Sequence, residues 1–423
     1  MGFEPFYILR EKDRPNPFGR LRELLKRYTL SAHKYGFPFL GGAVGYFSYD
    51  LGLDIEKIRQ KAEGGLDVPD LCLGFYDTII AIDHLKKKLS IISTGFPENS
   101  CLLAKKRAEH RLKQYAAELS GISNADLRKC QNPASPRPGR EVNAAAPNNL
   151  TSNFSKAKYL RSVMKAKEHI RRGDIYQVNL SQRFSLQSNI PAPALYARLR
   201  ASSPSDFSAY FDCGDFQILS SSPERFLHYD GKKVSTRPMK GTRPRGNSAA
   251  DDRRQREDLL KSAKDKAELI MIVDLLRNDL GRVCEYGSIK VKRPLRSLEK
   301  YSTVYQTTST IEGRLHRDKD RIDLLKACFP GGSITGCPKI RAMQIIKALE
   351  PAGRSVYTGA LGYLGFNRAM DLNILIRTIL KKKDKLYFQV GGGIVADSEP
   401  ENEYQETLVK ARGIFKAIGY LPY

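Results

Sequence analysis

The sequence predicts an α+β protein in which strands and helices come in uneven batches along the chain. Short β-rich runs, with aromatic residues inside them and turn residues between them, occupy much of residues 41–96. Long helical stretches recur in the second half, but without the regular strand–helix alternation of a doubly wound sheet. No internal repeat with a period of about 20 to 50 residues is present, which argues against a solenoid.

The first third of the chain predicts a β-rich region followed by one helix. GGAVGYFSYD, LCLGFYDTIIAIDH and KLSIISTGF predict antiparallel strands within residues 41–50, 71–84 and 88–96. A charged helix is expected at about 100–120. Asn, Pro, Ser, Gly and Ala dominate residues 126–150. This composition predicts a linker or mobile loop between an N-terminal region, 1–125, and a larger region, 151–423.

The larger region predicts helices and strands in turn. Ser155 is a candidate N-cap for a helix that ends at Gly173, and Asp230-Gly231 marks a hairpin between strands within 215–237. Another strand is expected within 174–186. The other expected helices lie at about 252–280, 319–328, 338–349 and 401–418, and the other expected strands lie near 288–292, 301–311, 357–366, 371–380 and 385–390.

The composition favours a folded protein with anionic partners. Of the 423 residues, 71 are Lys or Arg and 46 are Asp or Glu, which gives a formal net charge of +25. A nucleic-acid-binding protein is one alternative, but no nucleic-acid-binding motif accompanies the charge, so no nucleic acid is expected. No apolar run is long enough to span a bilayer and no signal peptide is recognisable, so a cytoplasmic protein without membrane contact is expected.

The seven cysteines are scattered along the chain and never form a C-x-x-C pair. They therefore predict buried thiols rather than a disulfide framework or a zinc site.

Two pairs of acidic residues lie on separate expected helices. Asp265 and Glu268 stand three residues apart, as do Glu403 and Glu406. Each pair lies beside an apolar stripe, formed by Leu269, Ile272, Val273 and Leu276 in the first helix and by Tyr404, Leu408, Ala411 and Phe415 in the second. A capping box of Ser398 and Glu401 is expected to begin the second helix. Two such helices can converge on a divalent cation, and oxygen-only donors suit Mg²⁺; solvated helix faces are the alternative.

Glycine-rich segments and one apolar strand add candidate binding groups. Gly391–Gly393 directly follow an expected strand, where they either let backbone N–H groups approach an anion or form a tight turn. Arg377 is a charge in an otherwise apolar strand, and its burial requires either a substrate carboxylate or a structural acid as partner. FPGGSITGCPKIRAMQII presents a helix N-terminus, with Pro338 in the first turn, to anions. No Walker motif, G-x-G-x-x-G spacing or hydrolase triad is present.

Lys240 lies in the stretch RPMKGTRPRG, in an expected Gly-Thr turn with three arginines around it, Arg237, Arg243 and Arg245. Such a cluster is typical of a solvated basic run, of a phosphate-binding site, of a site for a small dianion, or of a tuned reactive amine. The stretch alone leaves these four alternatives open.

Seven segments occur in the order found in chorismate-utilising enzymes. They are SSPERF (221–226), PMKGTRPRG (238–246), AELIMIVDLLRNDLGRV (267–283), FPGGSITGCPKIRAM (329–343), GALGYLGF (359–366), IRT (376–378) and GGGIVADS with EYQET (391–407). Densely over 155–420, the chain resembles component I of the aminodeoxychorismate synthases and, slightly less, of the anthranilate synthases. The resemblance implies two large antiparallel β-sheets packed on each other and flanked by helices, with a chorismate-binding catalytic region at 151–423.

The resemblance also implies a site, position by position. Glu268 and Glu406 match Mg²⁺ ligands, with Glu403 and Asp265 near the metal. Glu224 matches a general acid/base that protonates the departing C4 hydroxyl of chorismate. The implied chorismate contacts are Gly241, Thr242, Thr335, Tyr357, Arg377, Gly391, Gly392 and Gly393.

Two positions distinguish the activities within this family. Gln177 stands where the relatives that add water to chorismate carry a lysine base, which indicates an aminating enzyme. Lys240 stands where anthranilate synthases usually have alanine and aminodeoxychorismate synthases have lysine. We expect desolvation and repulsion from the neighbouring arginines to favour the neutral Lys240 amine, which can then attack C2.

The expected reaction is amination of chorismate at C4 by ammonia to 4-amino-4-deoxychorismate, on the route to p-aminobenzoate and folate. Anthranilate synthase, which makes anthranilate and pyruvate, is the alternative. The chain has no cysteine nucleophile in a glycine-rich elbow, so the ammonia is expected from a separate glutamine amidotransferase subunit or from solution.

The sequence departs from the family pattern in three places. YQTTST replaces a segment in which relatives have a histidine, so Gln306 or Tyr305 would have to take its role. SSPSDFSAYF (202–211) follows only loosely a segment that shapes a tryptophan pocket in relatives. Tryptophan binding is therefore not expected. The N-terminus is also expected to lack the family's opening strand.

Overall fold

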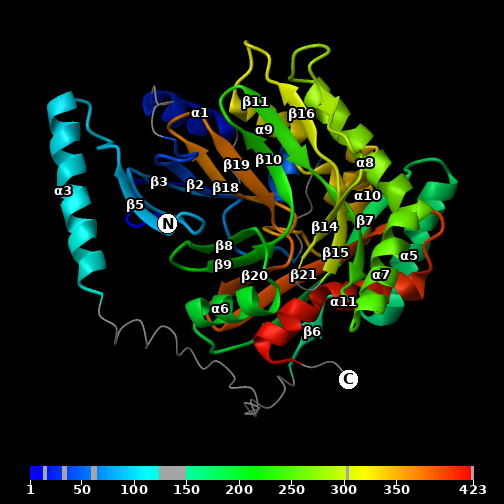
Figure 1. The fold of residues 1–423 in the computed structure, drawn as a ribbon. Coiled ribbons are helices and arrows are strands. Elements are labelled where there is room, and N and C mark those ends of the chain that lie inside the picture. The colour runs from blue at the N-terminus through cyan, green and yellow to red at the C-terminus, as the bar shows by residue number, and fades with distance from the viewer. Residues whose placement is uncertain (13–16, 31–35, 59–63, 123–148, 302–303, 421–423) are drawn as a thin grey trace.

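The computed structural model describes residues 1–12, 17–30, 36–58, 64–122, 149–301 and 304–420, and two large β-sheets dominate it (Figure 1). The nine strands of the first sheet are, in spatial order, β1 (Tyr7–Glu11), β3 (Leu71–Tyr76), β2 (Gly42–Phe47), β18 (Ala360–Gly365), β19 (Met370–Ile374), β10 (Arg225–Tyr229), β11 (Lys233–Arg237), β16 (Ile311–Arg314) and β13 (Lys290–Val291). The seven strands of the second sheet are β17 (Gly336–Cys337), β7 (Gln177–Gln187), β21 (Lys385–Ile394), β20 (Thr378–Lys382), β9 (Gln217–Ser222) and β8 (Phe207–Asp212), with β6 (Thr151–Ser152) beside β7.

Neighbouring strands run antiparallel in both large sheets. The two sheets share a hydrophobic core, to which the first contributes Tyr46 and Leu361 and the second contributes Ile218 and Leu380. Burial of these side chains from both inner faces holds the sheets together. The prediction of an α+β fold with two large antiparallel sheets packed on each other is confirmed.

Two smaller sheets complete the β-structure of the described residues. β12 (Met239–Pro244), β15 (Val304–Thr308) and β14 (Ser297–Lys300) form a three-stranded sheet, and β4 (Thr78–Asp83) pairs with β5 (Lys88–Ser93). The helices are α1 (Pro17–Arg27), α2 (Asp50–Ile55), α3 (Cys101–Ser120), α5 (Lys156–Arg171), α6 (Ala192–Ser202), α7 (Ala249–Lys261), α8 (Ala263–Gly281), α9 (Arg321–Cys328), α10 (Lys339–Leu349) and α11 (Pro400–Ile418), with a 3₁₀ turn, η1, at Gly332–Ile334. In Figure 1, α3 and β5 lie at the left edge of the molecule, whereas α5, α7, α8 and α10 lie at the right.

Local capping and turn residues explain several of the predicted elements. Ser155 caps α5 by accepting a hydrogen bond from the Lys158 N–H, and Asp230 closes the β10–β11 hairpin by accepting from Lys232 and Lys233. The apolar stripe predicted for residues 269–276 is buried in α8. These local predictions are confirmed.

Other local predictions are wrong. The helix expected over 252–280 is divided at Ser262, which caps α8 by accepting from the Asp265 N–H. The capping box at Ser398 does not form, because the Ser398 hydroxyl donates to Glu403 instead. Helices α1, α2 and α6 and strand β8 have no counterpart among the predicted elements.

The N-terminal strands share a sheet with strands from the end of the chain. β2 pairs directly with β18, so residues 42–47 and 360–365 lie side by side. The predicted boundaries at 125 and 150 stay a prediction, and residues 126–148 of the predicted linker lie outside the described residues. Within the described part of the chain, no helix has both the length and the apolar character needed to cross a membrane.

Candidate functional site

Lys240 lies in a strand rather than in the expected turn. β12 pairs with β15, and the register shifts between Lys240 and Thr242, where Gly241 has a φ of +71°. A glycine in this left-handed conformation is typical of a β-bulge, which turns the neighbouring side chain out of the regular alternation. Lys240 Nζ lies 3.6 Å from the position that a Cβ atom would take on Gly393. The bulged strand thus points the amine at the glycine segment of β21.

The three arginines around Lys240 are paired with acids. Arg237 forms an ion pair with Glu299, Arg243 Nη2 lies 3.2 Å from Asp265 Oδ2, and Arg245 Nε lies 2.6 Å from Asp252 Oδ1. Their positive charges are therefore balanced by neighbouring carboxylates. None of the three is an unpaired charge that could repel the Lys240 ammonium group as expected. That part of the sequence-based expectation is wrong, because sequence proximity did not reveal the carboxylates.

Glu224 is a buried carboxyl group between β9 and β10. Its side chain is 4% exposed, and Oε1 accepts a hydrogen bond of 2.6 Å from Ser333 Oγ in η1. Burial raises the pKa of Glu224 from 4.5 to about 7, although Ser333 and the positive charge of Lys240 both lower it. A substantial protonated fraction is thus present near neutral pH, which suits a proton donor within electrostatic reach of Lys240.

Gly391–Gly393 belong to β21 and do not form a turn. They pair with Ser181, Leu180 and Asn179 of β7, in that order. A Cβ atom on Gly391 would lie 2.9 Å from Asn179 Oδ1, and one on Gly393 would overlap Gln177 Nε2. These glycines leave room for polar side chains against the strand backbone. Gln177 Oε1 and Asn179 Oδ1 are buried without a hydrogen-bond partner among the described residues, so both remain available to a ligand.

Glu403 and Glu406 of α11 converge on the same glycine segment. A Cβ atom on Gly392 would lie 3.2 Å from Glu403 Oε2 and 3.5 Å from Glu406 Oε1. Glu403 is 4% exposed, its Oε1 accepts 2.6 Å from Ser398 Oγ, and burial raises its pKa. Its other oxygen, Oε2, is buried without a partner among the described residues. The pair thus supplies an unused carboxylate oxygen beside a second carboxylate.

Lys410 is a site residue that the sequence analysis missed. Its Nζ lies 2.6 Å from Glu406 Oε1 and donates 3.0 Å to the Gly391 carbonyl. The positive charge of Lys410 is the main reason that the pKa of Glu406 is lowered. The signal was the i, i+4 spacing from Glu406, which places the two side chains on one helix face.

Asp265 and Glu268 lie on α8, whose first turn faces α11. The charge of Lys264 in that turn partly opposes burial, which raises the pKa of Glu403, and adds to the effect of Lys410, which lowers the pKa of Glu406. Asp265 is already paired with Arg243, and Glu268 is half-buried. In the described part of the chain, no three His, Cys, Asp or Glu side chains are close enough together to hold a metal ion. The oxygen-only donors and the orphaned Glu403 Oε2 nevertheless fit a hard cation such as Mg²⁺.

Three other expected substrate contacts, Thr335, Thr242 and Tyr357, lie in different surroundings. Thr335 is fully buried and its hydroxyl donates 3.0 Å to the Gly331 carbonyl, whereas Thr242 is exposed and accepts 3.3 Å from Gln306 Nε2. Tyr357 lines a separate cavity of about 20 Å³ with Arg183, Arg354 and Gln389. The structure therefore brings Lys240, Glu224, the glycine segment and the α11 carboxylates together, and it leaves Tyr357 in a different packing environment.

Arg377 interrupts the apolar strand expected over 371–380. It lies between β19 and β20 with a φ of +50°, a conformation that is costly for a residue with a Cβ atom. Burial lowers the pKa of its guanidinium, and Tyr301 is the neighbouring group that opposes this change. Among the described residues no acid forms an ion pair with it. The alternative of a structural acid is thus not supported, and a ligand carboxylate stays a candidate partner.

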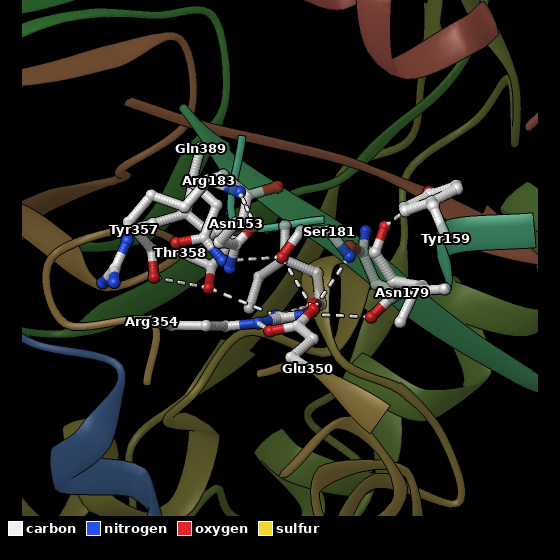
Figure 2. Close-up of polar contacts among 12 residues, drawn as sticks. Asn153, Tyr159, Asn179, Ser181, Arg183, Glu350, Arg354, Tyr357, Thr358 and Gln389 are labelled. Carbon is white, nitrogen blue, oxygen red and sulfur yellow. Dashed lines mark hydrogen bonds and ion pairs between the residues drawn. The ribbon is translucent and has the colours of Figure 1, made fainter. Parts of the chain in front are cut away.

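A buried ion pair holds the strand opposite the glycine segment (Figure 2). Glu350 Oε1 accepts from Arg354 Nη2 at 2.7 Å and from the Ser181 backbone N–H at 2.8 Å. Arg354 Nη2 also donates 2.7 Å to the Asn179 carbonyl, and its Nη1 donates 2.9 Å to the Ile334 carbonyl. Glu350 and Arg354 therefore fix β7 at the residues that pair with Gly391 and Gly393. The sequence analysis named neither residue.

A groove of about 890 Å³ lies elsewhere along α8. Its walls include Met271 and Leu275 of α8, Tyr176, and residues 337–340 at the start of α10. Lys240, Glu224, the glycine segment and the four acidic residues of α8 and α11 do not line it, whereas Pro338, at the helix N-terminus that the sequence analysis offered to anions, does. The groove is thus a feature separate from the cluster around Lys240.

Comparisons with known proteins agree on one family. A family model described as a chorismate binding enzyme matches residues 6–416. Anthranilate synthase component 1 of Thermus thermophilus is 40% identical over 400 residues, which cover 94% of this chain and 82% of that protein. Aminodeoxychorismate synthase component 1 of Bacillus subtilis is 36% identical over 385 residues, which cover 90% of this chain and 78% of that protein. The crystal structure of anthranilate synthase component I from Streptococcus pneumoniae matches with a TM-score of 0.82 at 33% identity, over 97% of this chain and 90% of that chain.

Proposed function

Because the chain belongs to the family of chorismate binding enzymes, we propose that it aminates chorismate at C4 with ammonia to give 4-amino-4-deoxychorismate. One observation carries this choice: the Lys240 amine points at Gly393 and lies close enough to Glu224 to lower the pKa of that carboxyl group. A nucleophile and a proton donor close enough to influence each other suit the replacement of a hydroxyl group through a covalent intermediate.

In this proposal Lys240 and Glu224 act in one step. The neutral Lys240 amine adds to C2 of chorismate, the ring double bonds shift, and the C4 hydroxyl leaves as water with the proton of Glu224. Ammonia then adds at C4, the double bonds shift back, and Lys240 leaves C2 with its bonding electrons. The ammonium group formed at C4 returns a proton to Glu224, so chorismate and ammonia give 4-amino-4-deoxychorismate and water, and both Lys240 and Glu224 are regenerated.

The remaining residues bind and orient the substrate. Arg377, which has no acidic partner among the described residues, pairs with a substrate carboxylate, and Lys410 and the Gly391–Gly393 backbone flank the ring. Glu268, Glu403 and Glu406, with Asp265 nearby, are the residues that would hold Mg²⁺. When bound, Mg²⁺ would neutralise the ring carboxylate and charge that develops there. Gln177 lies against Gly393, where its amide is available to the nucleophile or to ammonia.

The ammonia source in this proposal is a separate glutamine amidotransferase subunit. The relatives are named as component 1 of their enzymes, which supports a second component. Free ammonium at high concentration should then replace that subunit in an assay. The chain alone can therefore be tested without its partner.

Anthranilate synthase is the second candidate, because a relative with that name is 40% identical to the chain. In that reaction ammonia attacks C2 directly and pyruvate leaves, so a nucleophilic lysine at position 240 has no role. Incubation with chorismate, MgCl₂ and ammonium chloride, followed by mass spectrometry, separates the two. We expect 4-amino-4-deoxychorismate without pyruvate. Anthranilate with an equal amount of pyruvate, in the absence of any added lyase, would overturn the proposal.

The covalent step has a test of its own. We expect intact-protein mass spectrometry to detect a chorismate-derived adduct after acid quenching, and we expect Lys240→Ala to lose both the adduct and the activity. Lys264→Ala is the matched control, because Lys264 is also near the α11 carboxylates but is exposed and is not aimed at Gly393. Unchanged turnover by Lys240→Ala would remove the nucleophilic role.

A further inference from the structure

Two cysteines that are far apart in sequence meet between the two large sheets. Cys72 lies on β3 and is 2% exposed, and Cys213 follows β8 in the turn to β9 and is partly exposed. Cys213 packs against the core cluster that contains Cys72, Tyr46, Phe211 and Phe216. Each of the two thiols is the largest influence on the pKa of the other. No element of the proposed function uses this pair.

Arg10 covers the two thiols. It pairs with Cys72 in the β1–β3 register, its Nη1 donates 3.5 Å to the Cys213 carbonyl, and its Nη2 lies 2.8 Å from Asp215 Oδ1. The guanidinium is thus held over the turn and is electrostatically coupled to both sulfurs. A fixed cation beside a thiol pair stabilises a thiolate.

The pKa values of the two thiols shift in opposite directions, which favours Cys72 as the nucleophile. The interaction with Cys213 is the largest cause that lowers the pKa of Cys72, burial opposes it, and the charge of Arg10 lowers the pKa further. Cys72 is in turn the largest cause that raises the pKa of Cys213, followed by burial. This arrangement resembles the pairing of a reactive and a resolving cysteine in redox-sensitive proteins.

We propose that Cys72 and Cys213 form an oxidation-sensitive site that peroxides convert into a disulfide bond between the two sheets. The Cys72 thiolate attacks one oxygen of hydrogen peroxide, which breaks the O–O bond and gives a sulfenic acid and hydroxide. The Cys213 sulfur then attacks the Cys72 sulfur, and its proton leaves with the sulfenic hydroxyl as water. Overall, two thiols and one peroxide give one disulfide and two waters.

The other described cysteines lack this geometry. Cys284 and Cys328 are buried, Cys337 is half-buried, and Cys101 is exposed on α3. Among these, burial is the main cause that raises the pKa of Cys284, Cys328 and Cys337. The prediction of buried thiols is wrong for Cys101, which offers a matched exposed control.

Peptide mapping of the full chain tests the site. The reduced protein is treated with a small excess of hydrogen peroxide, free thiols are alkylated, and the protein is digested without reductant. We expect a cross-linked peptide pair containing Cys72 and Cys213 that dithiothreitol separates. It should be absent in Cys72→Ser and in Cys213→Ser and retained in Cys101→Ser.

The native geometry has a separate readout. Because the fold holds the thiols together, the cross-link should form at least about 10-fold faster in the native protein than in 8 M urea. Equal rates in the two conditions would overturn the proposal. Oxidation of Cys213 to a sulfinic acid without any Cys72–Cys213 peptide would also overturn it. These outcomes do not depend on the chorismate reaction, so the two proposals can fail separately.

Discussion

Ser333 Oγ donates a 2.6 Å hydrogen bond to Glu224 Oε1, and this contact joins the glycine-rich loop before α10 to a buried carboxyl group. Glu224 is 4% exposed, and burial outweighs the bond from Ser333 and raises the pKa of Glu224 to about 7. The two residues therefore set the protonated fraction of Glu224 near neutral pH. Replacing Glu224 and replacing Ser333 should change the free energy of unfolding in opposite directions.

Replacement of Glu224 should stabilise the fold at high pH. Since its pKa rises from 4.5 in the unfolded chain to about 7 in the folded chain, the folded state binds more protons between these values. The free energy of unfolding therefore falls as the pH rises from about 4.5 to about 7. Glu224→Gln should raise the free energy of unfolding by about 3 kcal/mol at pH 8 and change it little at pH 4.

Urea denaturation at the two pH values measures this difference, and Glu118→Gln on the exposed face of α3 serves as the control. The same Glu224→Gln variant should lose at least about 100-fold in turnover. A stability change that is equal at both pH values would contradict the assignment of a buried, titrating carboxyl group.

Removal of the Ser333 hydroxyl should move the pH profile. The bond from Ser333 lowers the pKa of Glu224, so Ser333→Ala should raise that pKa above about 7 and shift the alkaline limb of kcat to higher pH. The free energy of unfolding should fall by about 1 kcal/mol. Ser202→Ala, which removes a hydroxyl bonded to Leu199 and Gly413 far along the chain from Glu224, should leave the limb in place. An alkaline limb that moves to lower pH would contradict the prediction.

A side chain at Gly393 should conflict with Gln177. A Cβ atom there overlaps Gln177 Nε2, so Gly393→Ala should cost about 1–3 kcal/mol of stability and most of the activity. The additional change Gln177→Ala removes the overlapping atoms and should recover much of the stability. Chemical denaturation of the two single variants and the double variant measures this coupling. Gly65→Ala is the control, since nothing lies within 4 Å of its Cβ position. Additive effects would indicate that the two residues do not touch.

Sequence patterns predicted the elements of this fold where local chemistry decides the structure. The apolar stripe of α8, the Ser155 cap and the Asp230-Gly231 turn each depend on residues within a few positions of one another. Ser262 divides the helix expected over 252–280 by capping α8, and Arg377 divides the strand expected over 371–380 by its left-handed φ. Hydrophobic periodicity detects neither a single cap nor a left-handed φ.

Resemblance proposed the site residues, whereas spacing along the sequence does not show which of them meet. Glu224 and Ser333 lie more than a hundred positions apart and meet only because two loops close on each other. The acids that pair with the arginines around Lys240 lie outside its segment, on α7, α8 and β14. Long-range partners of this kind decide the charge around Lys240, and the sequence of its own segment carries no information about them.

The Glu350–Arg354 ion pair should be needed for the shape of β7. Both side chains are at most 2% exposed, and breaking a buried pair leaves an uncompensated charge. Arg354→Met should therefore cost about 3–5 kcal/mol, measured as the free energy of unfolding. The double variant Glu350→Leu with Arg354→Met removes both charges and should cost less. Arg172→Met breaks an exposed pair with Glu168 and should cost at most about 0.5 kcal/mol. A double variant that is less stable than Arg354→Met would contradict the account.

Magnesium binding should depend on the orphaned oxygen of Glu403. Glu403 Oε2 is buried without a partner among the described residues and lies across Gly392 from Glu406, so a cation would use it directly. Glu403→Gln replaces one oxygen by an amide nitrogen and removes the charge, and it should weaken Mg²⁺ binding at least about 10-fold. Its stability should be maintained or increased, because burial already disfavours the charged carboxylate.

Isothermal titration calorimetry with MgCl₂ measures the affinity independently of turnover. Glu401→Gln is the matched control on the same helix, since its carboxylate is exposed and paired with Lys156. If Glu403→Gln and Glu401→Gln bind Mg²⁺ equally tightly, then the metal does not use α11 in the way proposed, and the role of Glu403 reduces to its hydrogen bond with Ser398.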